Sequence, residues 1–382
     1  MNKIVLFILL LFFISGTFVT MFNSVLASEL VEDTWYTKTP MKYEQNYFKV
    51  VAVGDKIYAI GSKAFGPFGA VKQYDTKTDT WIIKTIMPTI RYDCSVAFYQ
   101  GKIYCIGGYT DDPSPQLYCN VDTVEVYEPV TDTWSSKAAF PDEYGGYQAH
   151  VVNEQLFVIT RLGVIYVYNS DVDTWANVTN VPVQGRMAFS VVVDNKIVIG
   201  DHLSPYYIIG NTAVSDHIGL RIYDPKTNDW SEGKTSPEYV IFAAGVSAGV
   251  TTGVYAPEKV YIFGTAYTGD YDKYGTQPFA CVYDPMHDSW STVNASDLGR
   301  VAVVDDLLYI VGTSSLKQYV PLGYDPLGYS ARPIETDSSD HSESRLLWMF
   351  LTMSVVAIVV IVVIVISLFF YANRLRKNKN VS

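Results

Sequence analysis

Basic residues are scarce in this chain. The 382 residues contain 28 Lys and Arg against 39 Asp and Glu, and no basic block occurs outside the last ten residues. A nucleic-acid-binding surface needs clustered positive charge, so that class of partner is excluded. Gly and Pro, at 26 and 17 residues, stay near average usage, which excludes collagen-like and low-complexity chains. The 30 Tyr and 18 Phe, in contrast, indicate a folded protein rather than a disordered one.

The first 27 residues have the pattern of a secretory signal peptide. Lys3 supplies a positive start, residues 4–14 form an almost unbroken apolar run, and Val25-Leu26-Ala27 places small residues where signal peptidase cleaves. We therefore predict removal of residues 1–27 by cleavage after Ala27. An uncleaved membrane anchor is the alternative.

A second long apolar segment lies near the C-terminus. Residues 346–372 contain no charge, and about 20 apolar residues suffice to cross the hydrocarbon core. Trp348 and Tyr371 stand near its two ends, and the basic tail 373–382 contains no acid. These features predict one transmembrane helix over 346–372 and a cytosolic tail, as in a single-pass type I membrane protein.

The part between these segments is strongly acidic. Residues 28–345 hold 39 acidic and 23 basic residues, a net charge of −16, which favours cationic or neutral partners. Its last part, 334–345, is polar, charged and rich in Ser, and is predicted to be a flexible stalk. Residues 28–333 are then a folded domain outside the cell or in the lumen of a secretory-pathway organelle.

One pattern recurs along residues 28–333. A Tyr precedes a Trp by seven residues five times, at Tyr74–Trp81, Tyr127–Trp134, Tyr168–Trp175, Tyr223–Trp230 and Tyr283–Trp290. Upstream of each pair lies an apolar strand that follows a turn, as in GKIYCIGG from Gly101, and before it another strand rich in Val and Ala. Short β-branched runs at this density predict antiparallel sheet, with each unit a four-stranded meander.

A sixth unit begins with DLLYIVGT at Asp306 but has Pro326 where its Trp would stand. Proline cannot donate to a sheet ladder, so the outer strand of this unit is missing there. The segment EDTWYTKT, with Trp35, supplies that strand from the opposite end of the chain. Six units of roughly 50 residues, closed by an N-terminal strand, predict an all-β, six-bladed propeller without exposed edges.

The motif of a strand ending in Gly-Gly, followed by Tyr-Asp-Pro and a Trp, resembles the kelch repeat. The full doublet occurs at Gly107-Gly108, and the third unit has Thr160-Arg161 in its place. Four other units keep one member of the doublet, at Gly61, Gly200, Gly264 and Gly312. The resemblance covers essentially the whole of residues 28–333 and implies a kelch-type β-propeller, a fold that does not by itself fix an activity.

Four cysteines lie in a chain expected in a compartment where disulfides persist. They allow three complete pairings. We predict Cys105–Cys119, because this bond would close the long connection between the second and third strands of unit 2. Cys94 and Cys281 are then buried free thiols. Cys94–Cys119 is the alternative.

Two N-glycosylation sequons, Asn177-Val-Thr and Asn294-Ala-Ser, follow an outer-strand Trp by two to four residues. That position lies on the rim of a blade, so both sites are expected to be exposed and glycosylated. A third sequon, Asn380-Val-Ser, is expected in the cytosol and unmodified.

The kelch resemblance also brings enzymes into consideration. Kelch-type propellers include copper radical oxidases, which use two His, two Tyr and a Cys linked to one Tyr. His202 and His217 share one connection, beside Tyr206 and Tyr207, but no matching motif surrounds them. We interpret these histidines as solvated, and we expect neither a metal nor a cofactor. A membrane-tethered copper oxidase is the alternative function.

Six-bladed sialidases are a second enzymatic comparison. Their repeated Ser-x-Asp-x-Gly-x-x-Trp turn is absent here, because TKTDTW and PVTDTW lack the Gly. Arg91, Arg186 and Arg300 precede inner strands, where three arginines can grip a carboxylate. The alternative is that they hydrogen-bond carbonyl oxygens between blades. No carboxylate pair has a spacing typical of acid–base hydrolysis, so we predict that the protein is not an enzyme.

The lengths of the connections between second and third strands indicate a binding face. They are long in units 1, 2, 4 and 5 and short in units 3 and 6, which predicts a trough between two walls. Rigid aromatic side chains with a polar tip suit protein or sugar contacts. The candidate ligand-binding residues are Tyr109, Tyr118, Tyr206, Tyr207, Tyr267 and Tyr271, together with Arg91, Arg186 and Arg300. The sequence therefore predicts a membrane glycoprotein whose propeller binds a protein or glycan ligand through loops on one face.

Glycosidase treatment of the full-length protein from mammalian cells tests the predicted orientation. Peptide-N-glycosidase F is expected to increase its gel mobility, because both rim sequons face the lumen during synthesis. Asn177→Gln and Asn294→Gln should each remove one mobility step, and Asn380→Gln none. A mobility step that depends on Asn380 would contradict a cytosolic tail.

Overall fold

The structure, a computed structural model, describes most of the predicted domain. The described residues are 30–43, 46–61, 69–111, 118–142, 146–182, 187–202, 207–209, 212–214, 217–236, 246–268, 275–295 and 297–326. In this described part, no helix has the length and the apolar character needed to cross a membrane. The predicted signal peptide 1–27, stalk 334–345, transmembrane segment 346–372 and tail 373–382 lie outside the described residues.

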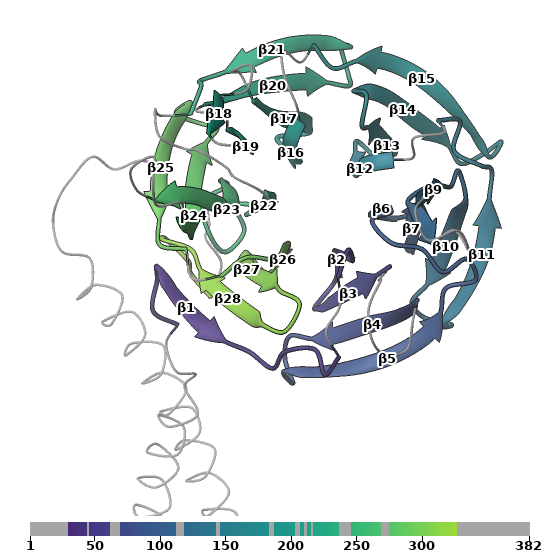
Figure 1. The fold of residues 1–382 in the computed structure, drawn as a ribbon, viewed down its shortest axis with the longest axis horizontal. Helices are drawn as coiled ribbons and strands as arrows, with labels where there is room; N and C mark the ends of the chain where they lie inside the picture. Colours follow the sequence, from purple (N-terminus) through teal and green to yellow (C-terminus); the bar gives the residue numbers. More distant parts are fainter. Residues whose placement is uncertain are drawn as a thin grey trace, which may run out of the picture. The chain divides into compact units, whose positions relative to one another are not determined.

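Six four-stranded antiparallel sheets surround a common axis and form the blades of a propeller (Figure 1). From the axis outward, the strands of each blade are called inner, second, third and outer. Blade 1 consists of β2 (Lys49–Val53), β3 (Lys56–Ile60), β4 (Ala70–Asp75) and β5 (Thr80–Ile86). Blade 2 consists of β6 (Ser95–Tyr99), β7 (Lys102–Ile106), β10 (Val124–Glu128) and β11 (Thr133–Lys137). Blade 3 consists of β12 (Gly146–Val152), β13 (Gln155–Thr160), β14 (Val164–Asn169) and β15 (Thr174–Asn180).

The other three blades repeat this order. Blade 4 consists of β16 (Met187–Val193), β17 (Lys196–His202), β20 (Ile218–Asp224) and β21 (Asp229–Gly233). Blade 5 consists of β22 (Ser247–Val250), β23 (Val260–Thr268), β24 (Gly275–Asp284) and β25 (Ser289–Val293). Blade 6 consists of β26 (Arg300–Val304), β27 (Leu307–Val311), β28 (Leu316–Val320) and β1 (Thr34–Thr37). Two small hairpins are added, β8 (Tyr109–Asp111) with β9 (Tyr118–Asn120) and β18 (Tyr207–Ile209) with β19 (Thr212–Val214).

The inner strands close into a ring. Each inner strand lies beside the inner strands of the two neighbouring blades, in the order β2, β6, β12, β16, β22, β26 and back to β2. The outer strands lie along the rim, one after another (Figure 1). The predicted all-β, six-bladed propeller is confirmed.

The N-terminal strand completes the last blade, as the sequence predicts. β1 pairs antiparallel with β28, and Trp35 lies opposite Tyr319. The hydroxyl of Tyr319 donates a hydrogen bond of 2.7 Å to Asp33, and the Lys317 ammonium donates one of 2.8 Å to Thr37. The two ends of the folded domain are thus joined in one sheet.

Tight turns between inner and second strands explain the Asn, Asp and Gly residues of the repeats. In four blades both central residues of this turn have positive φ: Gln100-Gly101, Asn153-Glu154, Asp194-Asn195 and Asp305-Asp306. Two positive φ values in a two-residue turn match the twist of the flanking strands. These turns fix the register of each hairpin.

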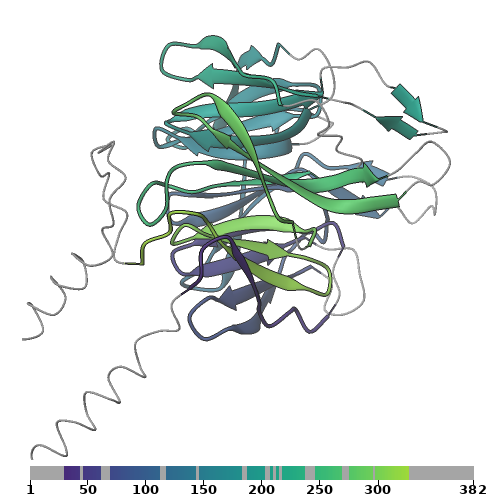
Figure 2. The same cartoon turned by 90° about the vertical axis from the view of Figure 1, so that its left-hand side faces the viewer.

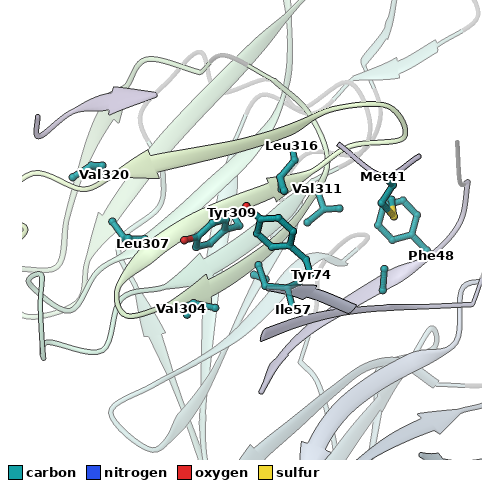
Figure 3. Close-up of a cluster of buried hydrophobic side chains, with 12 residues drawn as sticks. Met41, Phe48, Ile57, Tyr74, Val304, Leu307, Tyr309, Val311, Leu316 and Val320 are labelled. Atoms are coloured by element: carbon teal, nitrogen blue, oxygen red, sulfur yellow. The ribbon is translucent and has the colours of Figure 1, made fainter. Parts of the chain in front are cut away.

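The hydrophobic core of the described residues is divided into six clusters, each between two neighbouring blades. The cluster between blades 6 and 1 shows the arrangement (Figure 3). There Tyr74 and Ile57 of blade 1 pack against Tyr309, Val311 and Leu316 of blade 6. Because each blade is buried on both faces by its neighbours, no blade has a core of its own.

The repeated Tyr and Trp residues form a structural unit at the rim, which we call the latch. In all six blades the Tyr of the third strand lies opposite the Trp of the outer strand, with ring centroids 4.8–5.3 Å apart. Each Tyr hydroxyl donates a hydrogen bond of 2.5–2.8 Å to the Asp or Asn two residues before that Trp. The acceptors are Asp33, Asp79, Asp132, Asp173, Asn228 and Asp288. All six have positive φ, a backbone conformation that Asp and Asn adopt more readily than other side chains.

The latch also joins neighbouring blades. Asp173 of blade 3 accepts a second hydrogen bond, of 3.0 Å, from the backbone N–H of Ala138 in blade 2. Trp175 returns one of 3.2 Å from its indole N–H to the Ala138 carbonyl oxygen. The same two bonds link Asp288 and Trp290 to Lys234. The end of one outer strand is thereby fixed to the beginning of the next.

The predicted disulfide Cys105–Cys119 is wrong, because the structure pairs Cys105 with Cys94. Their Cα atoms are 5.9 Å apart, and both residues are fully buried between blades 1 and 2. Val96 faces Cys105 across β6 and β7, so Cys94, two residues earlier, points to the same side of the sheet. Cys281 is a buried free thiol, as expected.

Substitutions of Asp173 test the latch. The Tyr168 hydrogen bond, followed by that of Ala138, lowers the pKa of Asp173 below its ordinary value of 3.8. Its ionised form therefore stabilises the fold above about pH 4, and this contribution is lost as the pH falls through the lower folded-state pKa.

Asp173→Ala is expected to lower the free energy of unfolding by about 2–4 kcal/mol, because it leaves the buried Tyr168 hydroxyl without an acceptor and strains a left-handed residue. Asp173→Asn should have a much smaller effect, because Asn228 already occupies this position in blade 4. Denaturant unfolding at pH 7 and at about pH 2.5, below the ordinary pKa of Asp173, measures both. Equal losses for Ala and Asn would contradict the role of the acceptor.

Candidate binding face

One side of the ring gathers the features expected of a binding face. The inner strands β22, β26, β2 and β6 begin on the same side of the ring, because hydrogen bonds join their first residues or the residues just before them: Ser247 to Gly299, Arg300 to Phe48, and Asp93 to Tyr47. In an antiparallel blade the connection between the second and third strands lies on that same side. The hairpin β18–β19 and the far end of β23–β24 both project there (Figure 2). We call this side the binding face.

The described connections between second and third strands differ in length from blade to blade, as the sequence predicts. Blades 2 and 4 carry the hairpins β8–β9 and β18–β19, and blade 5 extends its own strands. Blade 3 has a short turn, in which the Gly163 N–H bonds to the Thr160 carbonyl oxygen, and blade 6 has one between Gly312 and Ser315. The long connection of blade 1, residues 62–68, lies outside the described residues, so the trough stays a prediction.

Charged side chains from four blades meet at the mouth of the channel. Asp93, two residues before β6 of blade 2, forms ion pairs of 2.9 Å with Lys49 of blade 1 and 3.5 Å with Arg161 of blade 3. Arg300 begins the inner strand of blade 6, and its Nε donates a hydrogen bond of 3.2 Å to the Phe48 carbonyl oxygen of blade 1. Two cations thus pair with Asp93, and the charge of the third, Arg300, acts on Lys49.

Three tyrosines complete this group, which we call the mouth cluster: Tyr47, Lys49, Tyr92, Asp93, Tyr109, Arg161 and Arg300. The Tyr92 and Tyr109 rings stack with centroids 6.0 Å apart, and Tyr47 lies 5.6 Å from Tyr92. The Arg161 guanidinium lies over the Tyr109 ring, 5.3 Å from its centroid. Tyr47 is 55 % exposed and Arg161 is also exposed, so the cluster presents both aromatic and cationic surface to solvent.

The electrostatics of the cluster follow from this crowding of cations. Burial lowers the pKa of Lys49, the neighbouring Asp93 raises it, and the charges of Arg300 and Arg161 lower it again. The side chains of Lys49, Arg161 and Arg300 therefore lie close enough for their positive charges to interact.

The backbone holds the cluster in place. Tyr92 and Tyr109 exchange two backbone hydrogen bonds, of 2.9 and 3.0 Å, and the Asp93 N–H donates to the Tyr47 carbonyl oxygen at 2.8 Å. Gly108 permits this close approach: a Cβ atom there would lie 2.7 Å from the Tyr92 carbonyl oxygen. The Gly-Gly doublet of blade 2 therefore allows the backbones of Tyr92 and Tyr109 to pair directly beneath the mouth.

Arg91 does not belong to the binding face. Its side chain is fully buried between blades 1 and 2, where it forms an ion pair with Glu125. It also donates hydrogen bonds of 3.1 and 2.9 Å to the carbonyl oxygens of Thr89 and Cys105. Burial lowers the pKa of Arg91, and Glu125 opposes that shift. Arg91 therefore has the structural role given as the alternative, and we remove it from the ligand-binding candidates.

The other predicted candidates are described to different extents. Tyr109 and Arg300 lie in the mouth cluster. Tyr118, Tyr207 and Tyr267 lie in β9, β18 and β23, in or beside the connections of the binding face, but their side chains are outside the described part. Arg186, Tyr206 and Tyr271 lie outside the described residues altogether. Asn177 and Asn294, the glycosylation candidates, are exposed on outer strands or just beyond them.

The described histidines are engaged in local contacts. His150 lies partly buried on the inner strand β12. Loss of solvation lowers its pKa to about 4, and its ring nitrogen lies 2.7 Å from the Ser190 hydroxyl of blade 4. A ring nitrogen of His217 lies 3.3 Å from the Ser236 carbonyl oxygen. Within the described ranges, no group of three His, Cys, Asp or Glu side chains gathers as a metal site would require.

Sequence reasoning missed Tyr47, Lys49, Tyr92, Asp93 and Arg161. A signal for Lys49 was present: like Arg300, which was among the candidates, it is the first residue of an inner strand, and the two lie opposite Ile60 and Val311 in neighbouring blades. Counting this position through the repeats places both at the channel mouth. Arg161 stands in the short turn that replaces the Gly doublet, so its departure from the motif was itself the signal.

A shallow hollow adds to the same face, outside the mouth. Its volume is about 510 Å³, and it is lined by Asn120, Asp122, Ala139, Phe140 and Pro141. A hydrogen bond of 2.7 Å from the Phe140 N–H to the Asp122 carbonyl oxygen joins two of the lining residues. The binding face is therefore uneven at its periphery as well as at its centre.

Comparisons with known proteins agree with this architecture. The model of the kelch motif matches residues 90–141, which include blade 2. The chain is 24 % identical over 202 residues to human Kelch-like protein 23, covering 50 % of this chain and 33 % of that protein. It is 23 % identical over 276 residues to Kelch-like protein 25 of Xenopus tropicalis, covering 68 % and 42 %. The chain thus spans well under half of the curated relatives it matches.

A solved structure supports the fold over a larger part of the chain. The structure of YjhT superposes with a TM-score of 0.55 at 15 % sequence identity, covering 73 % of this chain and 94 % of that one. At this level of identity the likeness concerns the fold alone.

The buried ion pair Arg91–Glu125 is expected to contribute far more to stability than Arg161, the exposed arginine of the mouth cluster. Arg91→Met is expected to lower the free energy of unfolding by about 3–5 kcal/mol, because it leaves the Glu125 carboxylate buried and unpaired. The double variant Arg91→Met/Glu125→Leu should recover most of that loss. Arg161→Ala, at an exposed position, should change stability by less than about 1 kcal/mol. Denaturant unfolding measures all three, and a double variant no more stable than Arg91→Met would refute the pairing argument.

Proposed function

We propose that this kelch-repeat β-propeller protein binds a protein ligand through its binding face, with the mouth cluster at the centre of the contact. Kelch propellers are generally protein-binding scaffolds. The observation that carries the proposal is the convergence of three tyrosines, two arginines and a lysine from blades 1, 2, 3 and 6 at one channel mouth.

The composition of the mouth cluster suits a protein contact. Tyr and Arg are the residue types that contribute most to binding energy in protein interfaces, chiefly at the centre of the contact. Tyr47 and Arg161 are exposed, whereas Tyr92 is buried beneath them and holds their positions. The hairpins β8–β9 and β18–β19 enlarge the surface around this centre.

The sequence supports a membrane setting for this activity. We propose a single-pass type I glycoprotein, anchored by residues 346–372, that displays the propeller outside the cell or in the lumen of a secretory organelle. The exposed positions of Asn177 and Asn294 on outer strands leave room for glycans away from the mouth. Binding rather than catalysis is the proposed activity.

Proximity labelling on cells compares the full-length protein with two variants. The mouth variant carries Tyr47→Ala and Arg161→Ala, and the control variant carries Lys77→Ala and Met286→Ala in exposed turns between third and outer strands. A ligand labelled by the wild type should be labelled equally by the control and at least about tenfold less by the mouth variant, as loss of interface hot spots implies. Purified components then give the affinities directly.

Equal affinity of the mouth variant and the wild type would contradict the proposal. Stoichiometric copper in the purified protein, with peroxide release from alcohols or sugars, would replace it by the copper-oxidase alternative.

A further inference from the structure

We infer that the side of the ring opposite the binding face carries an apolar patch that lies against the membrane in which the protein is anchored. This inference rests on the membrane setting of the proposed function and adds a lipid partner. The lipid class is a zwitterionic phospholipid surface, such as that of phosphatidylcholine. The binding face then points away from the membrane.

The chain enters and leaves the folded domain on this side, which we call the exit face. β28 begins at the short turn on the binding face, so its last residue, Val320, lies on the opposite side. Thr34 pairs with Val320, so β1 begins on that side too. The sequence predicts the anchor from residue 346, and 19 residues separate it from residue 326, the last described one. A flexible chain of this length spans about 24 Å on average, which holds the exit face near the bilayer.

Blade 5 has an insertion on the exit face. In the other five blades two residues join the inner strand to the second strand, whereas nine residues, 251–259, join β22 to β23. The buried carboxylate of Asp306 in blade 6 accepts hydrogen bonds of 2.7–3.0 Å from the N–H groups of Val254, Tyr255 and Ala256. The insertion is thus fixed to the neighbouring blade.

Two further segments meet this insertion. The Asp325 N–H donates a hydrogen bond of 2.6 Å to the Tyr255 carbonyl oxygen, and the rings of Tyr255 and Tyr324 lie 6.4 Å apart. The Gly323 N–H donates a bond of 3.0 Å to the Glu32 carboxylate, just before β1. The insertion, the segment after β28 and the segment before β1 therefore form one continuous surface.

Each of these three segments exposes one aliphatic side chain, and together we call them the exit patch: Val31, Val254 and Leu322. Their exposed fractions are 62 %, 52 % and 64 %. Tyr255 and Tyr324 lie partly buried between the segments. Contiguous exposed apolar side chains mark interaction sites, and tyrosine is enriched where proteins meet the lipid–water boundary. The composition of the exit patch therefore suits the surface of a bilayer.

The charges beside the exit patch favour a neutral lipid surface. Glu32, Glu258 and Asp305 are exposed acids on or next to these segments. The ammonium of Lys259, at the end of the insertion, is paired with Asp284 at 3.5 Å. An anionic bilayer would repel the exposed acids, whereas choline headgroups would not. Anionic lipids charge the cytoplasmic leaflet, and the proposed topology places the propeller on the other side of the membrane.

A fluorescent label at position 322 measures contact with lipid. The full-length protein carries Cys119→Ser and Leu322→Cys, and bimane is attached to the new thiol, because the other cysteines are buried. Leu162→Cys is the matched control, since Leu162 lies in a turn of the binding face and is 67 % exposed. In phosphatidylcholine vesicles that contain a lipid with a headgroup nitroxide, the label at position 322 should be quenched at least about threefold more strongly than at position 162.

The tether alone brings position 322 near the bilayer, so a second comparison isolates the exit patch. In the protein labelled at position 322, Val31→Ser with Val254→Ser is expected to lower the quenching by at least about half, because burial of apolar surface drives interfacial contact. Val130→Ser with Val172→Ser changes two exposed valines in turns of blades 2 and 3 on the same face and should leave the quenching unchanged. Thermal unfolding checks that all variants are folded.

Equal quenching at positions 322 and 162, or no effect of Val31→Ser with Val254→Ser, would overturn the exit patch. Stronger quenching in vesicles with added phosphatidylserine would overturn the preference for a neutral surface. Extraction with alkaline carbonate tests the anchor separately. Release of the wild type would refute the membrane setting and this inference with it, whereas retention with equal quenching refutes the exit patch alone. Binding of the protein ligand at the mouth is measured independently of both results.

Discussion

The hydrogen bond from a buried tyrosine hydroxyl to an Asp or Asn in a left-handed turn is the interaction on which this fold depends. The bond occurs in all six blades. In blades 1, 2, 3 and 5 the acceptor also binds a backbone N–H of the preceding blade. One short motif thus fixes an outer strand to its own blade and to its neighbour. Because the rim is held in this way, the connections at the channel mouth are free to differ in length and composition.

The mouth cluster is formed by residues in and beside these variable connections. Its charged side chains come from blades 1, 2, 3 and 6, so their separation is set by the packing of blades rather than by any single loop. Beneath it, Arg91, Glu125 and the disulfide Cys94–Cys105 tie the beginning of β6 to the interface between blades 1 and 2. A buried ion pair in this place gives position rather than net stability. The cations above it can therefore keep a fixed geometry although they repel one another.

Sequence reasoning predicts the parts of this molecule that repeat. The spacing from Tyr74 to Trp81 and its copies is a local consequence of one tight turn, and even Trp35 could be assigned because the sixth unit lacked its partner. The cysteine pairing failed because it was argued from loop length, whereas the register of β6 and β7 decides which side chains share a face. The prediction that Arg91 binds the ligand failed for a related reason. Arg91 lies near the mouth in the chain, but its side chain points into the interface and pairs with Glu125. The contacts of Asp93 join three blades, and no local spacing encodes them.

The pairing of β1 with β28 has a consequence for how the protein is made. Tyr319 and Asp33 are separated by 286 residues, so the first strand to leave the ribosome is the last to find its place. At roughly 5–20 residues per second, that strand waits about 15–60 s without its partner. During this interval the growing chain presents unpaired strands at both ends, and unpaired strand edges are prone to aggregation. Repeat proteins without such closure can fold unit by unit as they emerge, whereas this ring is complete only when residue 320 has been synthesised.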